Sequence, residues 1–209
     1  MIYWLTWIGV RLVAAVLLRL RYRGAENVPR RGPVLLAANH RSYLDPPLLG
    51  AGIGRRVQII AKEELLRPRL LGWFLRQLRV IPLRRGQADR RALRETLAVL
   101  AEGGVAAIFP EGTRSPTGEL LPPEVGAGML AYRSGATVIP VYIEGTQKAL
   151  PVGGRFRPAR VTITYGPPVA LPAPASGKPR HEDYARAAQA IMDAIARLRE
   201  ERAAARTAS

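Results

Sequence analysis

Short apolar runs alternate along the chain with longer segments whose apolar residues recur every three or four positions. The runs are rich in aliphatic residues and are bounded by Gly, Pro and Asn, a pattern typical of β-strands. The helical periodicity lies between and after them. The predicted strands are 34–38, 57–61, 105–109, 138–143 and 161–165. The predicted helices are 69–78, 89–102, 126–134 and 181–202.

The alternation of strands and helices indicates the fold class. Residues 106–109 read Ala-Ala-Ile-Phe, an uninterrupted apolar run that is typical of a strand covered on both faces. We therefore expect an α/β fold, with a mixed and mostly parallel sheet flanked by helices. The Pro/Ala/Gly-rich stretch 166–179 is interpreted as a loop, because too little chain follows it to build a second core.

The first 23 residues differ from the rest in containing two tryptophans and two apolar runs separated by Arg11. Basic residues follow the apolar stretch instead of preceding it, which argues against a secretory signal. A central Arg disfavours a spanning helix. On a helical wheel, Arg11, Arg19 and Arg23 fall within an arc of about 120°. We predict an amphipathic membrane-associating helix over 1–23, followed by one domain over 24–209. The alternative is a helix packed on the protein's own core.

Charge narrows the choice of partner. Among 209 residues, 32 Lys+Arg stand against 16 Asp+Glu, a net charge of +16, and there is no cysteine. Segment 55–94 alone holds 12 basic and 3 acidic residues, interleaved with leucines. A basic surface suits nucleic acid or an anionic membrane, and bulky aliphatic residues beside the charges favour the lipid surface. The absence of cysteine excludes disulfides, thiolate nucleophiles and zinc–cysteine sites.

His40 is the candidate base. It follows the first predicted strand, and in open α/β sheets ligands bind at such strand ends. Asp45 comes after a turn that Pro46 and Pro47 are expected to stop, and its carboxylate can return to the imidazole and fix its tautomer. The other histidine, His181, is expected to be a capping or surface residue. Taken alone, the His–Asp pair is weak evidence for catalysis, because a purely structural turn would show the same residues.

A second polar group follows the strand that ends at Phe109. Glu111 can hold an arginine or a substrate hydroxyl, Gly112 allows close backbone approach, Thr113 offers a hydroxyl, and Arg114 offers a fork for phosphate. Two further runs, 139–146 and 81–86, contain Gly beside Glu or Arg, and Arg85 belongs to the latter.

Asn39-His40…Asp45, Arg85-Gly86, Phe-Pro-Glu-Gly-Thr-Arg-Ser and Val-Ile-Pro-Val resemble, in this order, the four sequence blocks of the glycerolipid acyltransferase family. The resemblance extends from about residue 24 to 146. Two positions depart from the usual pattern: Arg84 stands where an acidic residue is common, and Glu124 stands near a common lysine.

The resemblance implies phospholipid biosynthesis by acyl transfer. A fatty acyl group would pass from acyl-CoA or acyl-carrier protein to the sn-2 hydroxyl of 1-acyl-glycerol-3-phosphate, giving phosphatidic acid without an acyl-enzyme. His40 and Asp45 would be the catalytic pair. Arg85 and Arg114 would bind the acceptor's phosphate, and Glu111, Gly112 and Thr113 would lie against its glycerol part. Backbone N–H groups near Gly112 or in the His40–Asp45 turn would meet the oxyanion.

The resemblance implies no resident cofactor or metal, the acyl thioester being a co-substrate. The expected location is the cytoplasmic face of the cell membrane, with anionic lipids and the acyl donor as partners and no nucleic acid. Three alternatives stay open. They are another lyso-lipid or glycolipid acceptor, a catalytically inactive lipid-binding scaffold, and a basic nucleic-acid-binding protein, which would leave the His40–Asp45 pair unexplained.

Overall fold

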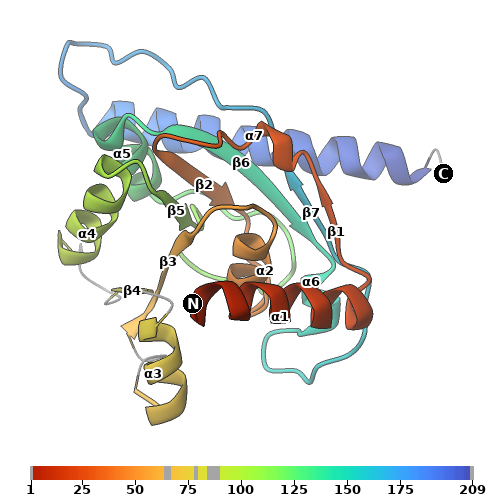
Figure 1. The fold of residues 1–209 in the computed structure, drawn as a ribbon. Coiled ribbons are helices and arrows are strands. Elements are labelled where there is room, and N and C mark those ends of the chain that lie inside the picture. The colour runs from red at the N-terminus through yellow and green to blue at the C-terminus, as the bar shows by residue number, and fades with distance from the viewer. Residues whose placement is uncertain (1, 64–66, 78–79, 84–89, 208–209) are drawn as a thin grey trace.

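A computed structural model describes residues 2–63, 67–77, 80–83 and 90–207 of the chain. Its strands form one sheet in the order β1-β7-β6-β2-β5-β3-β4 (Figure 1). The strands are β1 (Arg21–Arg23), β2 (Val34–Ala38), β3 (Val57–Lys62), β4 (Ile81–Leu83), β5 (Val105–Ile108), β6 (Thr137–Glu144) and β7 (Thr162–Tyr165). Every pairing is parallel except that of β6 with β7, which is antiparallel. The predicted α/β class with a mixed, mostly parallel sheet is confirmed.

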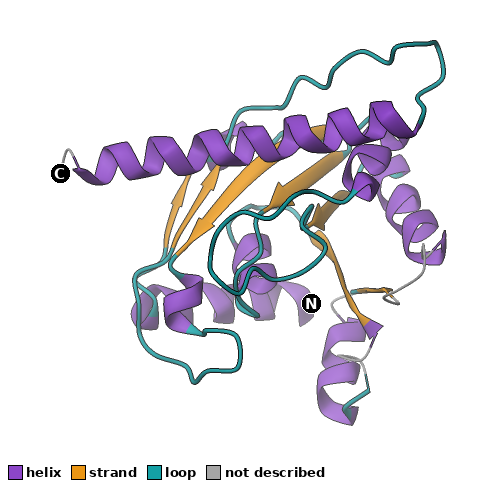
Figure 2. Ribbon diagram, turned by 180° about the vertical axis from the view of Figure 1, so that it is seen from behind, coloured by secondary structure: helices purple, strands orange, loops and turns teal. Residues whose placement is uncertain are grey.

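Helices cover both faces of this sheet (Figures 1 and 2). The helices are α1 (Ile2–Leu17), α2 (Asp45–Ala51), α3 (Arg69–Gln77), α4 (Arg90–Ala101), α5 (Val125–Ser134), α6 (Thr146–Ala149) and α7 (His181–Thr207), with a 3-10 turn η1 at Ala25–Asn27. Side chains of α1 and α2 pack with one face of the sheet, and those of α4, α5 and α7 pack with the other. The result is a three-layer arrangement.

The central strand β2 shows why the sheet must be covered twice. Val34 and Leu36 point into the core beneath α1 and α2, whereas Leu35 and Ala37 point into the core beneath α5 and α7. All four are fully buried. Side chains alternate between the two faces of a strand, so an uninterrupted apolar sequence supplies both cores at once.

The N-terminal helix is shorter than the sequence pattern suggested. It ends at Leu17, and Arg19 adopts a left-handed backbone with φ 43°. Residues Arg21–Arg23 then pair with β7 as strand β1. Arg19 and Arg23 therefore lie outside the helix, and the predicted arc of three arginines on one helical face is wrong. None of the helices in the described parts of the chain is both long and apolar enough to cross a bilayer.

Two further elements differ from expectation at their ends. Pro46 and Pro47 do not stop a turn but lie in the first turn of α2, where Pro is favoured because its missing N–H has no helical partner to lose. Helix α7 continues to Thr207, past the predicted end at residue 202.

The parallel strands place the polar loops together. Strands β2, β3, β5 and β6 run in the same direction, so their carboxyl ends share one edge of the sheet. The loops after β2 and β5 carry the two polar groups singled out in the sequence. Open α/β sheets bind ligands at this edge.

Candidate active site

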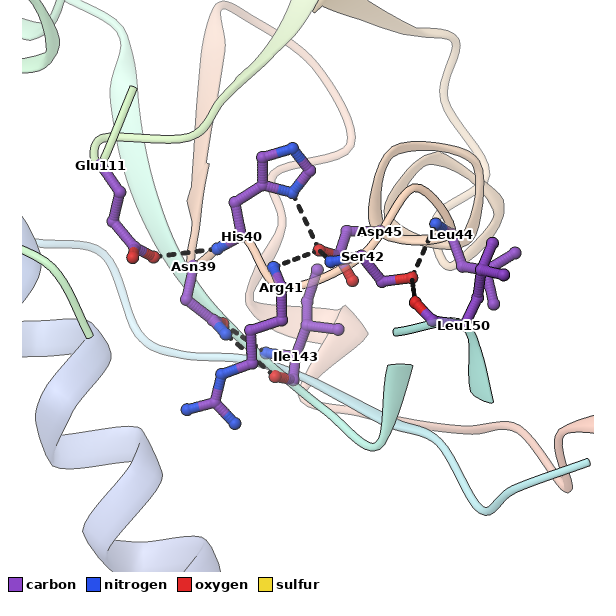
Figure 3. Close-up of polar contacts among 9 residues, drawn as sticks. All are labelled: Asn39, His40, Arg41, Ser42, Leu44, Asp45, Glu111, Ile143 and Leu150. Atoms are coloured by element: carbon purple, nitrogen blue, oxygen red, sulfur yellow. Dashed lines mark hydrogen bonds and ion pairs between the residues drawn. The ribbon is translucent and has the colours of Figure 1, made fainter. Parts of the chain in front are cut away.

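The side chain of Asn39 fixes the turn after β2 to the neighbouring strand β6. Its Nδ2 donates to the carbonyl oxygen of Ile143 at 3.0 Å, and its Oδ1 accepts from the Ile143 N–H at 2.7 Å (Figure 3). Asn39 is fully buried. This two-way pairing continues the hydrogen bonding of the sheet by one residue. His40 therefore leaves the sheet edge from a rigid position.

The imidazole of His40 lies against a buried carboxylate. Its Nδ1 is 2.9 Å from Oδ2 of Asp45, and the same oxygen accepts the N–H groups of Arg41 at 2.6 Å and Ser42 at 2.7 Å. Asp45 has no exposed surface, whereas 17% of the His40 side chain is exposed. Three donors thus converge on Oδ2 of Asp45, whereas the buried Oδ1 has no hydrogen-bond partner among the described residues.

This contact assigns the tautomer of His40. A carboxylate accepts hydrogen bonds, so Nδ1 carries the proton and Nε2 keeps the lone pair. Nε2 points away from Asp45 (Figure 3). The ring stacks on Phe109 with 4.0 Å between ring centroids, which fixes its plane. The geometry therefore presents a basic nitrogen whose protonated form Asp45 can stabilise.

Glu111 braces two backbone segments. Its Oε1 accepts the His40 N–H at 2.9 Å and its Oε2 accepts the Leu121 N–H at 3.0 Å. The residue is 3% exposed, and burial raises the pKa of its carboxyl despite these hydrogen bonds. The sequence predicts that Glu111 holds an arginine or a substrate hydroxyl. The structure instead places both of its oxygens on backbone amides.

Gly112 adopts a backbone that favours glycine. Its φ is 63°, and a β-carbon added there would come within 2.9 Å of the Glu124 side chain. The Gly112 N–H donates to the Phe109 carbonyl at 3.0 Å. Thr113 is exposed beside it. The tight turn lets the chain reverse directly after β5 and brings Arg114 back over the His40 turn.

Arg114 packs over the ring of Tyr43. Its guanidinium carbon is 3.6 Å from the ring centroid, and its Nη2 donates to the Tyr43 hydroxyl at 3.0 Å. The neighbouring Ser115 N–H donates to the carbonyl oxygen of His40 at 2.8 Å. The loops after β2 and β5 are thereby joined, and Arg114 lies against the turn that carries His40 and Asp45.

The last site residue predicted from the sequence is Arg85. Arg85, like Arg84, lies outside the described residues. Ser42 was not among the predicted site residues; its hydroxyl donates to the Leu150 carbonyl at 2.8 Å and so connects the His40 turn to the residue after α6. Sequence reasoning missed Tyr43 as the partner of Arg114 and Phe109 as the partner of His40. The position of Phe109 at the end of its predicted strand, just before the Glu111–Arg114 motif, is the one signal that the sequence offers.

Within the described ranges, no three His, Cys, Asp or Glu side chains gather in a way that could hold a metal ion. The polar groups at this edge instead comprise an imidazole, carboxylates and a guanidinium, which are suited to proton transfer and anion binding.

Comparison with known proteins agrees with this geometry. The model of a protein family described as Acyltransferase matches residues 19–144. The chain is 33% identical over 136 residues to the 1-acyl-sn-glycerol-3-phosphate acyltransferase BAT2 of Brassica napus chloroplasts, covering 63% of this chain and 39% of that protein. It is 29% identical over 147 residues to the 1-acyl-sn-glycerol-3-phosphate acyltransferase of Bacillus subtilis, covering 69% and 70%.

A solved structure is also similar over most of the chain. The crystal structure of the 1-acyl-sn-glycerophosphate acyltransferase PlsC from Thermotoga maritima superimposes with a TM-score of 0.77 at 30% identity, covering 95% of this chain and 78% of that one. The chain spans about two fifths of the length of the plant chloroplast relatives. The family model nevertheless covers well over half of the chain, including both polar loops, and the protein belongs to the Acyltransferase family.

Proposed function

We propose that this protein transfers a fatty acyl group from an acyl thioester to the sn-2 hydroxyl of 1-acyl-glycerol-3-phosphate, forming phosphatidic acid. The observation that carries the proposal is the 2.9 Å contact between His40 Nδ1 and the buried carboxylate of Asp45, which leaves Nε2 free as a base. The names of the relatives support the choice of acceptor.

The proposed step needs one base and no covalent enzyme intermediate. Nε2 of His40 takes the hydroxyl proton while the acceptor oxygen attacks the thioester carbonyl. The tetrahedral intermediate collapses, the carbon–sulfur bond breaks, and the leaving thiolate takes the proton from the imidazolium. Asp45 stabilises the positive charge on His40 between these events. General-base catalysis of this kind contributes about 10²–10⁴-fold.

The oxyanion must be stabilised by donors that are not already engaged. Three of the backbone donors expected from the sequence have partners: the N–H groups of Arg41 and Ser42 bind Asp45, and that of Gly112 binds Phe109. These groups shape the site, and we assign them no direct part in binding the oxyanion.

The acceptor's phosphate is assigned to Arg114, with Arg85 as a second candidate from the sequence. Gly112 and Thr113 lie beside Arg114 and are assigned to the glycerol part. Glu111 is assigned a positioning role, because both of its oxygens hold backbone amides, one of them that of His40. Arg114→Lys is expected mainly to raise the KM for the acceptor, since it replaces a bidentate fork with a point charge.

The position of Glu124 favours a second candidate acceptor. Its side chain packs directly against Gly112, so a negative charge lies close to the proposed glycerol and phosphate contacts. An acceptor with a neutral or zwitterionic head group would tolerate that charge better than a phosphate monoester. The second candidate function is therefore acyl transfer to another lyso-lipid.

The test is an activity matrix of donors and acceptors. Acyl-CoA and acyl-carrier protein are each combined with lysophosphatidate, lysophosphatidylcholine and monoacylglycerol, using the wild type and His40→Ala. We expect transfer to lysophosphatidate that His40→Ala abolishes, with the melting temperature unchanged. Preference for a neutral acceptor would support the second candidate. An active His40→Ala protein would refute the mechanism.

Membrane association at the cytoplasmic face is the second part of the proposal. Helix α1 presents apolar side chains to solvent: Trp4, Leu5, Ile8, Leu12, Val13, Val16 and Leu17. Its polar groups face inward. Arg11 donates to the Ala51 carbonyl at 3.2 Å and stacks on Trp7. An apolar outer face next to a chain of charge +16 suits an anionic lipid surface.

A further inference from the structure

Tyr43 is an exposed aromatic residue within the turn that joins the two proposed catalytic residues. It lies between His40 and Asp45 in the sequence, and 53% of its surface is exposed. The cores that stabilise the fold do not include it. Large aromatic side chains usually bury most of their surface. The exposure of Tyr43 therefore calls for an explanation other than packing.

The contact that Tyr43 makes is with Arg114. The guanidinium carbon lies 3.6 Å from the ring centroid and Nη2 donates to the hydroxyl at 3.0 Å, so one side chain provides both a stacking surface and an acceptor. This combination fixes the plane of the guanidinium. A long, flexible side chain held in one orientation loses less entropy when it binds a ligand.

The other end of the guanidinium has an unused donor. Nη1 of Arg114 is shielded from solvent and has no hydrogen-bond partner among the described residues. A buried donor without a partner costs free energy that a ligand acceptor can recover. Tyr43 covers the face of the guanidinium and engages Nη2. Because Nη1 is shielded, an anionic oxygen reaches it only when the groups covering it move aside, and that oxygen then meets a donor that has no competing partner.

The neighbouring backbone sets where that anion would lie. The Ser115 N–H binds the carbonyl oxygen of His40 at 2.8 Å, so the loop carrying Arg114 is tied to the turn carrying Tyr43. A phosphate bound by Arg114 is thereby held at a fixed place relative to Nε2 of His40. The orientation of Arg114 would then determine whether an acceptor hydroxyl reaches the base.

We infer that Tyr43 is a positioning residue that holds Arg114 in the orientation that binds the phosphate of the acceptor, and that it thereby sets the preference for an anionic over a neutral head group. The inference rests on the proposed function. It assigns to Tyr43 an effect on acceptor binding that passes through Arg114, and no contact with the reacting atoms.

The kinetic test uses Tyr43→Leu, Tyr43→Phe, Arg114→Lys and the double variant Tyr43→Leu/Arg114→Lys in the full chain. We expect Tyr43→Leu to raise the KM for lysophosphatidate about five- to tenfold, the scale of a cation–π contact with its hydrogen bond. The kcat and the KM for the acyl donor should change less than about twofold. Tyr43→Phe keeps the ring and should show a smaller effect.

The energetic coupling between Tyr43 and Arg114 distinguishes a positioning role of Tyr43 from a general structural one. In the Arg114→Lys background, Tyr43→Leu should add little, because the planar group that the ring holds is already absent. The preference for lysophosphatidate over monoacylglycerol should fall in Tyr43→Leu. Arg91→Lys, at an exposed arginine on α4, is the matched control and should leave both KM values unchanged. Additive effects, or a loss confined to kcat and melting temperature, would overturn the inference.

A binding measurement separates this inference from the proposed reaction. Glycerol 3-phosphate is titrated into the wild type and Tyr43→Leu, with glycerol as the uncharged control. Suppose that the wild type acylates none of the acceptors, and that Tyr43→Leu binds glycerol 3-phosphate more weakly than the wild type does. The proposed function then fails, and the role of Tyr43 stands. If the wild type acylates lysophosphatidate and Tyr43→Leu changes neither KM nor binding, the inference alone fails.

Discussion

At the scale of single residues, Asp45 illustrates how one oxygen atom can serve both fold and chemistry. Oδ2 accepts two backbone N–H groups of the turn as well as Nδ1 of His40. The same contacts that close the turn therefore fix the tautomer of the base. A substitution must preserve the turn in order to report on the chemistry.

Asp45→Asn meets that requirement. Its amide oxygen can still accept from Arg41 and Ser42, but a neutral amide does not stabilise an imidazolium as a carboxylate does. We expect kcat to fall by about 10²-fold or more with a small change in acceptor KM. Steady-state kinetics and the melting temperature check this. A kcat within twofold of the wild type would show that Asp45 is only structural.

Glu111→Gln tests the brace between the two loops. Glutamine has one accepting oxygen, so either the His40 or the Leu121 N–H loses its partner. A buried donor left without a partner costs about 1–3 kcal/mol, and we expect the free energy of unfolding in urea to fall by that amount. Acyl transfer should fall through kcat, since the backbone of His40 shifts. An unchanged unfolding midpoint would contradict the assignment.

The pH dependence of the same residue has a defined sign. Burial raises the pKa of Glu111 above its ordinary value of 4.5, so the folded state binds more protons than the unfolded state just above that pH. The stability contributed by the carboxyl is therefore greatest below pH 4.5 and is lost as the pH rises through the raised pKa. The difference in unfolding free energy between the wild type and Glu111→Gln should decrease over this range.

Only some of the contacts in this site could be predicted from the sequence. His40 and Asp45 are close in the chain and follow a strand, so a turn alone can bring them together. The contacts of Glu111 with His40 and of Arg114 with Tyr43 each join positions 71 apart. Whether they form depends on β2 and β5 being neighbours in the sheet, which hydrophobic periodicity does not specify. The residue type of Arg114 and its place in the motif indicate an anion ligand. They could not show that an exposed tyrosine contacts it.

At the scale of elements, periodicity located the long helices and the five main strands but not the short elements. Strand β1 is three residues long and carries two arginines, so its sequence shows no apolar pattern. Helix α2 has two prolines in its first turn, directly after Asp45, where the sequence pattern predicts the end of a turn. In both cases tertiary contacts decide: β1 pairs with β7, and α2 packs beneath α1.

A contact at the N-terminus of α7 leads to a prediction about thermal stability. Asp183, in the first turn, accepts the Arg180 N–H at 2.8 Å and the Ala175 N–H at 3.0 Å, and these hydrogen bonds lower the pKa of its carboxyl. Such a carboxylate satisfies a helix-end donor and ties the preceding loop to the helix. Asp183→Asn should lower the melting temperature at pH 7, whereas Asp193→Asn, further along α7, should not.

The sign of the pH effect at Asp183 is opposite to that at Glu111. A lowered pKa means that the stabilising contribution is present above the ordinary value of 3.8 and is lost as the pH falls through the lowered value. The melting temperatures of the wild type and Asp183→Asn should therefore converge as the solution is acidified below pH 3.8. A difference that persists unchanged in acid would show that the charge of Asp183 is not responsible.

At the scale of the whole molecule, the net charge of +16 comes from arginines that have different roles. Arg55 donates hydrogen bonds to three backbone carbonyls, those of Pro29, Gly32 and Gly103, and so joins loops of the fold. Arg11 faces the protein, and Arg114 is assigned to the acceptor. The remaining surface charge and the apolar outer face of α1 make separate contributions to membrane binding, one sensitive to salt and one not.

These two contributions can be measured separately with lipid vesicles. Leu12→Glu/Val16→Glu places two charges on the exposed face of α1, and Ala203→Glu/Ala204→Glu makes the same change in charge at the exposed end of α7. Removing a Leu and a Val from lipid contact forfeits about 1.5–3 kcal/mol each. We expect the α1 variant to lose at least about tenfold in affinity for vesicles of phosphatidylglycerol and phosphatidylcholine, and the α7 variant to lose much less.

Salt then distinguishes the apolar contribution from the charge. Raising the salt concentration from about 0.1 to 0.5 M shortens the screening length and should weaken binding of both variants and the wild type to the anionic vesicles. The difference between wild type and the α1 variant should survive, because burial of apolar surface is not screened. Equal losses in the α1 and α7 variants would mean that charge alone recruits the protein. Binding of the α1 variant at wild-type affinity in high salt would remove α1 from the membrane contact.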